Sequence, residues 1–351
     1  MWEKNKEIAK LFTSEGAKKL PIYNWFYYKE AFSPQLLDLF KPRGSILDPF
    51  SGSGTTALWA KLNGQTALGI DAFPLAVFIG QAKTKNYSDD MLSAAEALIP
   101  RVGCCDMGFC WKWEAIVEPK KAIPKRNLGF FLRARAQISK EWFDGAEILL
   151  LALLSSVSQC SLAVKDGGVL RTDLRKSALP AKDVFRRKAK RFIAEARASK
   201  STGKASVVEG DARMLGFQEE FDWVFTSPPY LNAIDYQRVY SLEAGLLGAE
   251  PSTKIRSYLK AEGTDAVSDY FCDMEKVMHG IEASLKRGGR CALVVGNAVI
   301  AGNVIEVDKR IVEASESIGL MLRKAVYAER VVHIGKERKK ARETLLLFEK
   351  K

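Results

Sequence analysis

The feature that most constrains the fold is a strand, a glycine-rich turn, a helix and a second strand within about 27 residues. The strand Ser45–Phe50 (SILDPF) leads through the turn SGSG into a helix predicted over Thr55–Asn63. After Gly64 the chain continues as the strand Thr66–Asp71 (TALGID). Two strands joined by a helix in so short a span form a βαβ unit, whose strands lie parallel in one sheet. The sequence therefore predicts an α/β protein.

The same alternation of short apolar runs and helical stretches continues along the chain, with a further helix expected from Phe73 onward. It predicts a doubly wound, Rossmann-like α/β sheet of seven strands. The strand candidates are Ser45–Phe50, Thr66–Asp71, Ala205–Asp211, Phe221–Ser227, Cys291–Asn297, Lys324–Val332 and Glu343–Glu349. A polar, hairpin-like connection joins the last two, which favours an antiparallel strand at the edge of the sheet.

Between residues 85 and 204 the strand pattern stops, and Ala, Leu, Lys and Arg recur at helical spacing. We expect a helical insertion here, so that residues 1–84 and 205–351 together form the core. The uncharged run Ile148–Val164 within the insertion contains four serines and a glutamine. It is shorter and more polar than the roughly 20 apolar residues that span a bilayer, which favours a buried helix.

Positive charge is concentrated in the insertion. Of the net +12, the stretch Arg171–Lys204 contributes +9, with twelve basic and three acidic residues. A second run, Glu118–Lys140, has seven basic residues interleaved with Phe130 and Phe131. Basic residues gathered on one face displace counterions from a nucleic-acid backbone. Two such runs favour a nucleic-acid partner over an ordinary solvated helix face, and the insertion is the predicted target-recognition region.

Composition excludes several classes of protein. With 47% hydrophobic and 27% charged residues the chain is globular and not disordered. Its opening, MWEKNKEIAK, lacks the apolar segment of a secretory signal, so we expect a cytoplasmic protein without a membrane partner. The six cysteines form no CxxC pair, and neither histidine is near the group Cys104, Cys105 and Cys110. We therefore expect reduced thiols and no metal.

The glycine turn and three aspartates indicate a cofactor site. Glycines allow close approach of the backbone to a ligand, and the N-terminus of the following helix offers free amide donors. No Lys-Ser or Lys-Thr pair follows the turn, so it is not a nucleotide-hydrolase loop. Asp48, Asp71 and Asp211 each end a predicted strand, and ligands of open α/β sheets bind at these ends. Asp71 suits ribose hydroxyls and Asp211 an adenine amino group, in NAD or an adenosyl cofactor.

The segment Thr226–Tyr230 (TSPPY) follows an apolar strand and indicates the chemistry. Its two prolines fix φ and remove two backbone donors, which leaves carbonyl oxygens in a rigid arrangement. Such oxygens suit the hydrogens of an exocyclic amine and localise its lone pair for attack on a methyl group. Tyr230 offers a flat face on which an extruded base can stack. We expect Tyr230 and the glycine turn to share one cavity.

DPFSGSGTT together with TSPPY resembles the paired signature motifs of amino-group DNA methyltransferases, which use S-adenosylmethionine on a seven-stranded α/β fold. The segments Trp25–Leu39 and Ser284–Arg290 are similar to further parts of that family, so the resemblance covers roughly residues 1–84 and 205–351. It implies that the methionine part of S-adenosylmethionine contacts Asp48, Phe50, Gly52, Gly54 and Thr55. It also implies that Asp71 contacts the ribose and that Asp211 contacts the adenine. For the catalytic segment, it implies that the Ser227 side chain and the Pro228 carbonyl bind the target amine. By the same resemblance, Pro229 completes the rigid proline pair, and Tyr230 stacks on the target base.

The first position of the second motif bears on the target base. Ser227 stands where adenine-specific relatives usually have Asp or Asn, which resembles the N4-cytosine subgroup. The glycine motif precedes TSPPY, whereas many N4-cytosine enzymes have the reverse order, so N6-adenine stays an alternative. Methylation at cytosine carbon 5 is excluded, because it needs a cysteine after a proline and none of the 12 prolines precedes one.

Several alternatives remain open at this stage. DNA is the predicted partner, but the charge signal also fits a structured RNA. A binding module without catalysis would not need TSPPY, and a protein glutamine methyltransferase would leave the basic runs without a role. Asn232, Asp235, Tyr236 and Arg238 either line a base pocket or form a short amphipathic helix. The sequence does not say whether a separate restriction endonuclease accompanies the protein, and the chain itself shows no nuclease constellation.

Overall fold

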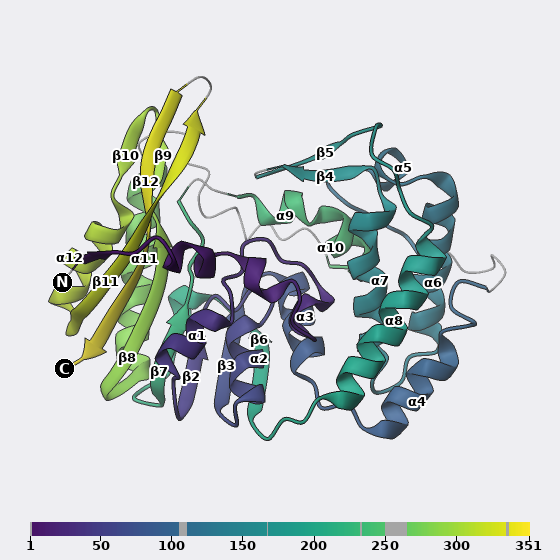
Figure 1. Cartoon of the computed structure of the whole chain (residues 1–351), viewed down its shortest axis with the longest axis horizontal. Coiled ribbons are helices and arrows are strands. Elements are labelled where there is room, and N and C mark those ends of the chain that lie inside the picture. The colour runs from purple at the N-terminus through teal and green to yellow at the C-terminus, as the bar shows by residue number, and fades with distance from the viewer. Residues whose placement is uncertain (1, 105–110, 167, 232–233, 250–264, 335–336) are drawn as a thin grey trace.

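The computed structural model describes residues 2–104, 111–166, 168–231, 234–249, 265–334 and 337–351, and one large mixed sheet lies beside a group of helices (Figure 1). The strand order is β1-β11-β12-β8-β7-β2-β3-β6. These strands are β1 (Trp2–Lys4), β2 (Ser45–Asp48), β3 (Thr66–Asp71), β6 (Lys204–Glu209), β7 (Phe221–Thr226), β8 (Leu285–Gly296), β11 (Leu320–Ile334) and β12 (Glu337–Lys350). All seven predicted strands are present, and the doubly wound α/β fold is confirmed.

The antiparallel strand is not at the edge, and that part of the prediction was wrong. β12 pairs antiparallel with both β8 and β11, so the last strand of the chain is inserted between two earlier ones. The long ladder between β11 and β12 holds this arrangement together. The short strand β1 pairs parallel with β11 and forms the outer edge. β8 also begins earlier than expected, because the stretch from Leu285 already pairs with β7.

Helices cover both faces of the sheet, as side-chain alternation along the strands requires. On β2, Ile46 packs with the helices α1 and α2, whereas its neighbour Leu47 packs with α11 and α12 on the other face. Val224 and Phe225 divide in the same way on β7. The helices are α1 (Gln35–Phe40), α2 (Thr55–Leu62), α3 (Pro74–Thr84), α11 (Asp265–Ser284) and α12 (Val307–Ser317).

The insertion packs around one buried helix, α7 (Glu147–Cys160). Its apolar run ILLLALL is buried throughout, as the sequence predicted. No helix within the described ranges combines the length and the apolarity needed to cross a bilayer. The other helices of this region are α4 (Asp89–Leu98), α5 (Pro119–Ala122), α6 (Lys125–Lys140) and α8 (Ala181–Ala198), and they share a core with α3 and with α10 (Ser241–Leu247).

The insertion is not wholly helical, contrary to the prediction. A hairpin of β4 (Ala163–Asp166) and β5 (Val169–Thr172) follows α7 and contacts α9 (Tyr236–Val239). A second small hairpin, β9 (Ala298–Ile300) with β10 (Asn303–Ile305), follows β8. The strands β4 and β5 are only four residues long, too short for a clear alternating pattern. Their Asp-Gly-Gly connection is nevertheless a known turn signal that points to a hairpin.

Candidate active site

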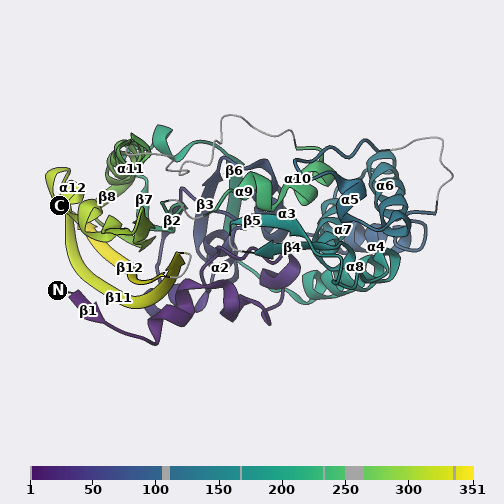
Figure 2. The ribbon, with the colours of Figure 1, turned by 90° about the horizontal axis from the view of Figure 1, so that it is seen from above.

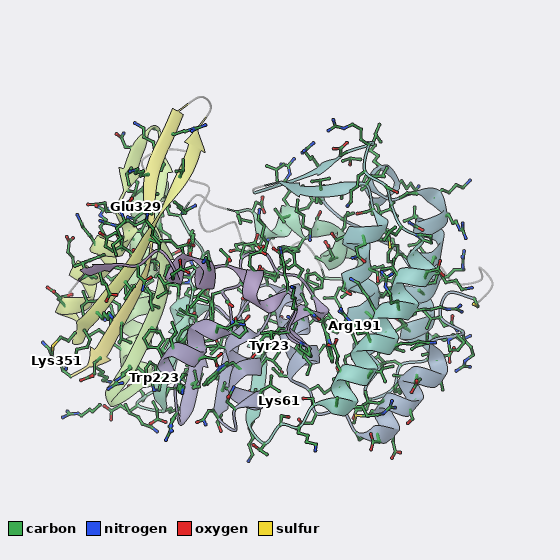
Figure 3. The ribbon with its side chains drawn as sticks, in the orientation of Figure 1. Tyr23, Lys61, Arg191, Trp223, Glu329 and Lys351 are labelled. Atoms are coloured by element: carbon green, nitrogen blue, oxygen red, sulfur yellow. The ribbon has the colours of Figure 1, made fainter. Side chains whose placement is uncertain are left out.

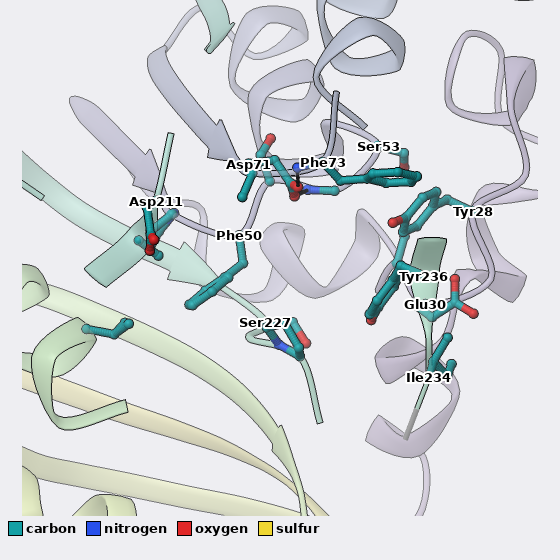
Figure 4. A pocket seen from close by; sticks show the side chains of 18 of the residues that line it. Tyr28, Glu30, Phe50, Ser53, Asp71, Phe73, Asp211, Ser227, Ile234 and Tyr236 are labelled. Carbon is teal, nitrogen blue, oxygen red and sulfur yellow. Dashed lines mark hydrogen bonds between the residues drawn. The ribbon is translucent and has the colours of Figure 1, made fainter. Parts of the chain in front are cut away.

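An open cavity of about 1260 Å³ lies where the strand order reverses, at the carboxyl ends of β2 and β7 (Figure 4). From β2 the chain passes outward to β3, and from β7 it passes outward in the opposite direction to β8. Ligands of doubly wound sheets bind at such a switch point. Seven of the predicted site residues line the cavity, namely Phe50, Gly52, Thr55, Asp71, Asp211, Ser227 and Pro229.

The glycine turn is held in shape by a carboxylate from the next strand. The backbone N–H of Gly52 donates to Asp71 Oδ2 at 2.7 Å, and that of Phe73 donates to Oδ1 at 2.9 Å. Gly52 and Gly54 adopt φ values of +50° and +80°, which favour glycine. At Gly54 a side chain is excluded for a second reason, since a Cβ there would lie 2.9 Å from the Cα of Gly80. Gly54 therefore packs α2 against α3 and does not line the cavity.

Asp48, which is predicted to contact the methionine part of a cofactor, is buried and is not among the residues that line the cavity. Its Oδ1 accepts a hydrogen bond from Thr226 Oγ1 at 2.6 Å and another from the N–H of Phe50 at 3.2 Å. The side chain is 2% exposed, and burial raises the pKa of Asp48 to about 6. Asp48 thus connects the end of β2 to the end of β7 and positions the residues on either side.

The two aspartates predicted to bind the nucleoside differ in their electrostatics. Burial raises the pKa of Asp71 to about 6, although three backbone N–H donors oppose the shift. Hydrogen bonds from Arg213 hold the pKa of Asp211 below its usual range, and the closest of them is 2.6 Å long. Arg213 also contacts Asp273 at 3.1 Å. The Asp211 carboxylate is therefore paired with a charged side chain, whereas, among the described residues, the Asp71 carboxylate is bonded only by backbone N–H groups.

Ser227 faces the cavity at the end of β7. Its hydroxyl donates to the carbonyl of Val294 on β8 at 3.1 Å, which leaves the oxygen lone pairs for another donor. Pro228 is buried between Ser227 and Pro229, which both line the cavity. The hydroxyl of Tyr270 lies 3.4 Å from the Pro229 carbonyl. Among the described residues, no hydrogen bond occupies the carbonyl of Pro228.

Tyr230 does not share this cavity, and that expectation was wrong. Its ring packs on Gly296 of β8, where an added Cβ would lie 2.6 Å from the tyrosine ring. Its hydroxyl donates to Glu343 of β12 at 2.7 Å, and the Arg330 guanidinium lies 5.9 Å from the ring centroid. The rigid diproline turn sends the side chain to the outer side of the segment. The Tyr230 side chain therefore lies on the side of β11 and β12.

Tyr28 and Tyr236 form the wall opposite Phe50 and belong to a stack of three tyrosines whose third member, Tyr240, is buried (Figure 4). Tyr28 is parallel to Tyr240 with ring centroids 4.7 Å apart, and parallel to Tyr236 at 6.0 Å. Tyr240 donates its hydroxyl to Glu30 at 2.7 Å, and burial raises the pKa of Glu30. The N-terminal aromatic segment and α9 are thereby joined at the edge of the cavity.

Of the four residues expected beyond TSPPY, Asp235 and Tyr236 line the cavity, Arg238 is exposed and Asn232 lies outside the described residues. Asp235 also caps α9, because its carboxylate accepts from the N–H of Arg238. Sequence reasoning missed one complete face of the cavity on α11. Tyr270, Met274 and Val277 line it together, and their spacing of four and three residues is an amphipathic signal that could have revealed it.

The basic runs have a mixed structural role. On α6, the buried Arg135 donates to the carbonyls of Leu246 and Leu247 at 3.0 and 2.9 Å. On α8, Lys188 donates to the Ser155 carbonyl at 2.5 Å and Arg186 to that of Pro100 at 2.8 Å. The exposed basic residues of α8 are Lys182, Arg187, Lys190, Arg191 and Arg197. In both ribbon views α8 lies within the insertion and not beside β2 and β7 (Figures 1 and 2).

Comparison with known proteins finds similarity to DNA methyltransferases. Residues 30–81 match the model of a DNA methylase family. The chain is 28% identical over 294 residues to the Type II methyltransferase M.BsoBI of Geobacillus stearothermophilus, with 72% of this chain and 58% of that protein covered. It is 27% identical over 286 residues to the Type II methyltransferase M.AvaI of Nostoc sp., with 68% and 56% covered. The chain thus spans a little over half the length of these curated relatives.

Similarity to solved structures is weaker. A TehB-like SAM-dependent methyltransferase from Corynebacterium glutamicum aligns at a TM-score of 0.33 and 13% identity, covering 91% of this chain and 86% of that one. A TM-score this low supports no conclusion about fold or function. The fold is therefore established by the strand order of the chain itself.

Proposed function

We propose that the chain, which is similar to a DNA methylase family and to Type II methyltransferases, methylates an exocyclic amino group of a base in DNA, with S-adenosylmethionine as methyl donor. The observation that supports this most directly is the shared cavity of the glycine turn and Ser227–Pro229. We propose further that the reaction is of the restriction-modification type, in keeping with the Type II relatives.

The cavity fits S-adenosylmethionine in shape and chemistry. Phe50, Phe73, Met274 and Val277 provide apolar surface for an adenine ring, and Asp71 provides acceptors for ribose hydroxyls. The N-terminus of α2 and the glycine turn present backbone to the same space, where a carboxylate finds amide donors. When bound, S-adenosylmethionine supplies an electrophilic methyl group on a sulfonium centre.

Ser227 and the Pro228 carbonyl hold the target amine. Each accepts one hydrogen of the exocyclic NH₂ group, which pulls the nitrogen out of conjugation and localises its lone pair. Both acceptors are preorganised: the Ser227 hydroxyl is oriented by its bond to Val294, and the prolines fix the backbone. Because the groups do not need to rearrange during the reaction, their stabilisation of the transition state is not lost to reorganisation.

Tyr230 stacks on the target base in this proposal, but from the outer side of the diproline turn. One ring face is covered by Gly296, so the base takes the other face, toward Arg330. Base-aromatic stacking of this kind is worth about 1 to 3 kcal/mol. The hydrogen bond from Tyr230 to Glu343 fixes the ring in one orientation, so little further ordering is needed.

The same geometry suggests where the DNA backbone lies. The hairpin of β11 and β12 bounds the Tyr230 side and stands at the carboxyl ends of the strands (Figure 1). Arg338 and Lys340 on β12 are exposed, and the Lys340 side chain is 77% accessible. These residues lie close to the position from which a base would approach, whereas the basic face of α8 is remote from it. We therefore assign phosphate contacts to this hairpin first.

We propose cytosine N4 as the target amine. The support is the neutral hydroxyl of Ser227 at the first position of the motif. Incubating the protein with unmethylated DNA of mixed sequence and S-adenosylmethionine, followed by digestion and mass spectrometry, should yield N4-methylcytosine. N6-methyladenine instead would overturn the base assignment and leave the amine mechanism standing, whereas no modified base would overturn both. Adding tRNA as a competitor tests whether RNA is the substrate instead. We expect that tRNA does not inhibit methyl transfer to DNA.

Substitution of Ser227 tests its role in base choice. Ser227→Asp should abolish cytosine methylation or shift the product toward adenine, because the new carboxylate is charged and larger. The matched control is Ser93→Asp on the exposed surface of α4, which should leave the product unchanged. Cytosine methylation at the wild-type rate in Ser227→Asp would contradict the assignment.

A further inference from the structure

A second cavity lies between the core and the insertion, and the proposed methyl transfer does not use it. Its volume is about 550 Å³, and residues of α2, α3 and the end of α8 line it. The two cavities have no lining residue in common within the described chain. They lie at opposite ends of α2, whose eight residues span about 12 Å. Figure 3 shows Lys61, which lines this second cavity, at the lower edge of the molecule.

Three lysines line this cavity, and two of them have partners. Lys61 donates to the carbonyls of Thr84 and Lys85 at 2.7 and 2.8 Å, where it caps the C-terminus of α3. Lys85 forms ion pairs with Asp144 and Glu147. The nearby carboxylate of Glu195 accepts from the indole N–H of Trp25 and the N–H of Ile22. The carboxylates of this region are thus engaged elsewhere.

Lys83 is the third lysine, and it is a buried amine without a partner. It is 4% exposed and lines the cavity, yet no hydrogen bond or ion pair reaches it from any described residue. Burial lowers the pKa of Lys83 to about 7. An unpaired buried charge is costly, so such a lysine either loses its proton or takes an anion.

The rest of the lining favours an anion. None of the described residues that line the cavity is acidic. Ser199 and Ser201 from the end of α8 and Asn86 from the segment after α3 add hydroxyl and amide donors. Neither serine hydroxyl is hydrogen-bonded to another described residue. Residues of the core and of the insertion therefore line one small space together with Lys83.

We propose that this cavity binds a small tetrahedral oxyanion of the phosphate or sulfate class, held by Lys83 with Ser199 and Ser201. Charge-assisted hydrogen bonds are about twice as strong as neutral ones, which makes Lys83 the principal ligand. The anion joins α3 of the core to the end of α8, so it also fixes the insertion on the core. The proposal does not depend on the methyltransferase activity.

Binding is tested by following thermal unfolding of the full chain in phosphate, in sulfate and in chloride at equal ionic strength. Phosphate and sulfate should raise the unfolding temperature and saturate, because a ligand that binds only the folded state stabilises it. Equal unfolding temperatures in all three salts would overturn the proposal. A nucleoside monophosphate distinguishes the source of the anion: a shift equal to that of phosphate indicates that a nucleotide phosphate also enters, and no shift limits the site to the free ion.

Variants of the cavity residues test whether Lys83 binds an anion or only stabilises the fold. Lys83→Met should lose the phosphate-dependent shift and weaken binding at least tenfold, while unfolding without phosphate stays equal or moves to higher temperature. Ser199→Ala with Ser201→Ala should weaken binding several-fold, which keeps the test available if Lys83→Met does not fold. The matched control, Lys120→Met on the exposed surface of α5, should retain the full shift. An unchanged phosphate shift in Lys83→Met contradicts the site.

Discussion

The carboxyl edge of the sheet and the helical insertion use their polar residues differently. At the edge, Asp71, Asp211 and Ser227 line an open cavity and keep acceptor atoms available to a ligand. In the insertion, Arg135 and Lys188 also come from conspicuous sequence runs, but their donors are occupied by backbone carbonyls of the same chain. A side chain at the end of a parallel strand faces the open edge of the sheet and keeps acceptor capacity even where it has one partner, as Ser227 has in Val294. A side chain on a packed helix meets the carbonyls of its neighbours.

This difference shows that a local motif predicts a functional site more reliably than a run of charged residues does. A turn such as DPFSGSGTT specifies a backbone shape, so its ligand-facing groups follow from the sequence itself. A run of lysines and arginines specifies only charge, and its use depends on tertiary packing. If the comparison is right, substitutions at the edge reduce catalysis and leave folding intact, and substitutions of buried basic residues in the insertion do the reverse.

The largest effect on catalysis is expected for Ser227→Ala. Removing one acceptor from the target amine should lower kcat about 10²- to 10³-fold, as for other preorganised groups that stabilise a transition state. The unfolding free energy should change by no more than about 1 kcal/mol, because one hydrogen bond to Val294 is lost. Single-turnover methylation and urea unfolding measure the two quantities. Ser93→Ala is the control, and loss of folding in parallel with activity would contradict the separation.

Arg135→Met should show the opposite behaviour. Its guanidinium bonds the two final carbonyls of α10 and stacks on Trp111 with 3.8 Å from Cζ to the ring centroid. Losing these bonds leaves buried carbonyls unsatisfied, so we expect a loss of about 2 to 4 kcal/mol in unfolding free energy. The control Arg126→Met lies exposed on the same helix and should change stability by less than about 0.5 kcal/mol. Equal stability of the two variants in urea would break the comparison.

The strands of the core could be predicted because each is a short apolar run bounded by turn residues. The order of the last two could not, because β12 pairs with its hairpin neighbour β11 and also with the earlier strand β8, and no local signal predicts this second pairing. The hairpin of β4 and β5 was missed because four-residue strands show no clear periodicity. The first error concerns tertiary pairing, and the second concerns local conformation.

At the site, the sequence predicted which backbone segments come together, but it did not predict the direction of each side chain. Asp48 and Gly54 belong to the glycine motif, yet one connects β2 to β7 and the other packs on Gly80. Tyr230 follows the diproline turn and points to β12. The contribution of α11 depends on a helix more than 40 residues farther along the chain, and no local pattern links Met274 to Ser227.

Lower pH should affect folding and cofactor binding in opposite directions. Burial raises the pKa of Asp48 and of Asp71 to about 6, above that of an unfolded aspartate, so the folded state binds more protons. Between pH 7 and pH 5 each group therefore adds roughly 1 kcal/mol to stability. The ionised Asp71 that accepts ribose hydroxyls is lost over the same range, so affinity for S-adenosylmethionine should fall up to about tenfold. Urea unfolding and calorimetric titration check the two trends.

Asp71→Asn isolates this group. Its stability should respond to pH by roughly 1 kcal/mol less than the wild type between pH 7 and pH 5, because one titrating site is gone. Its affinity for S-adenosylmethionine should be weak and independent of pH over this range. A wild-type pH dependence of affinity in Asp71→Asn would show that another group binds the ribose.

The smallest effect concerns the salt dependence of DNA binding. If the hairpin of β11 and β12 contacts phosphates, Arg338→Ala with Lys340→Ala should lower the magnitude of the log–log salt slope by about 2, because each contact contributes about 0.9. Arg187→Ala with Lys190→Ala on α8 removes the same charge and should leave that slope unchanged. Fluorescence anisotropy with labelled duplex DNA at several salt concentrations measures both. A loss of slope in the α8 variant alone would assign the backbone contacts to the insertion, and charge runs would then predict DNA contacts as well as motifs predict the cofactor site.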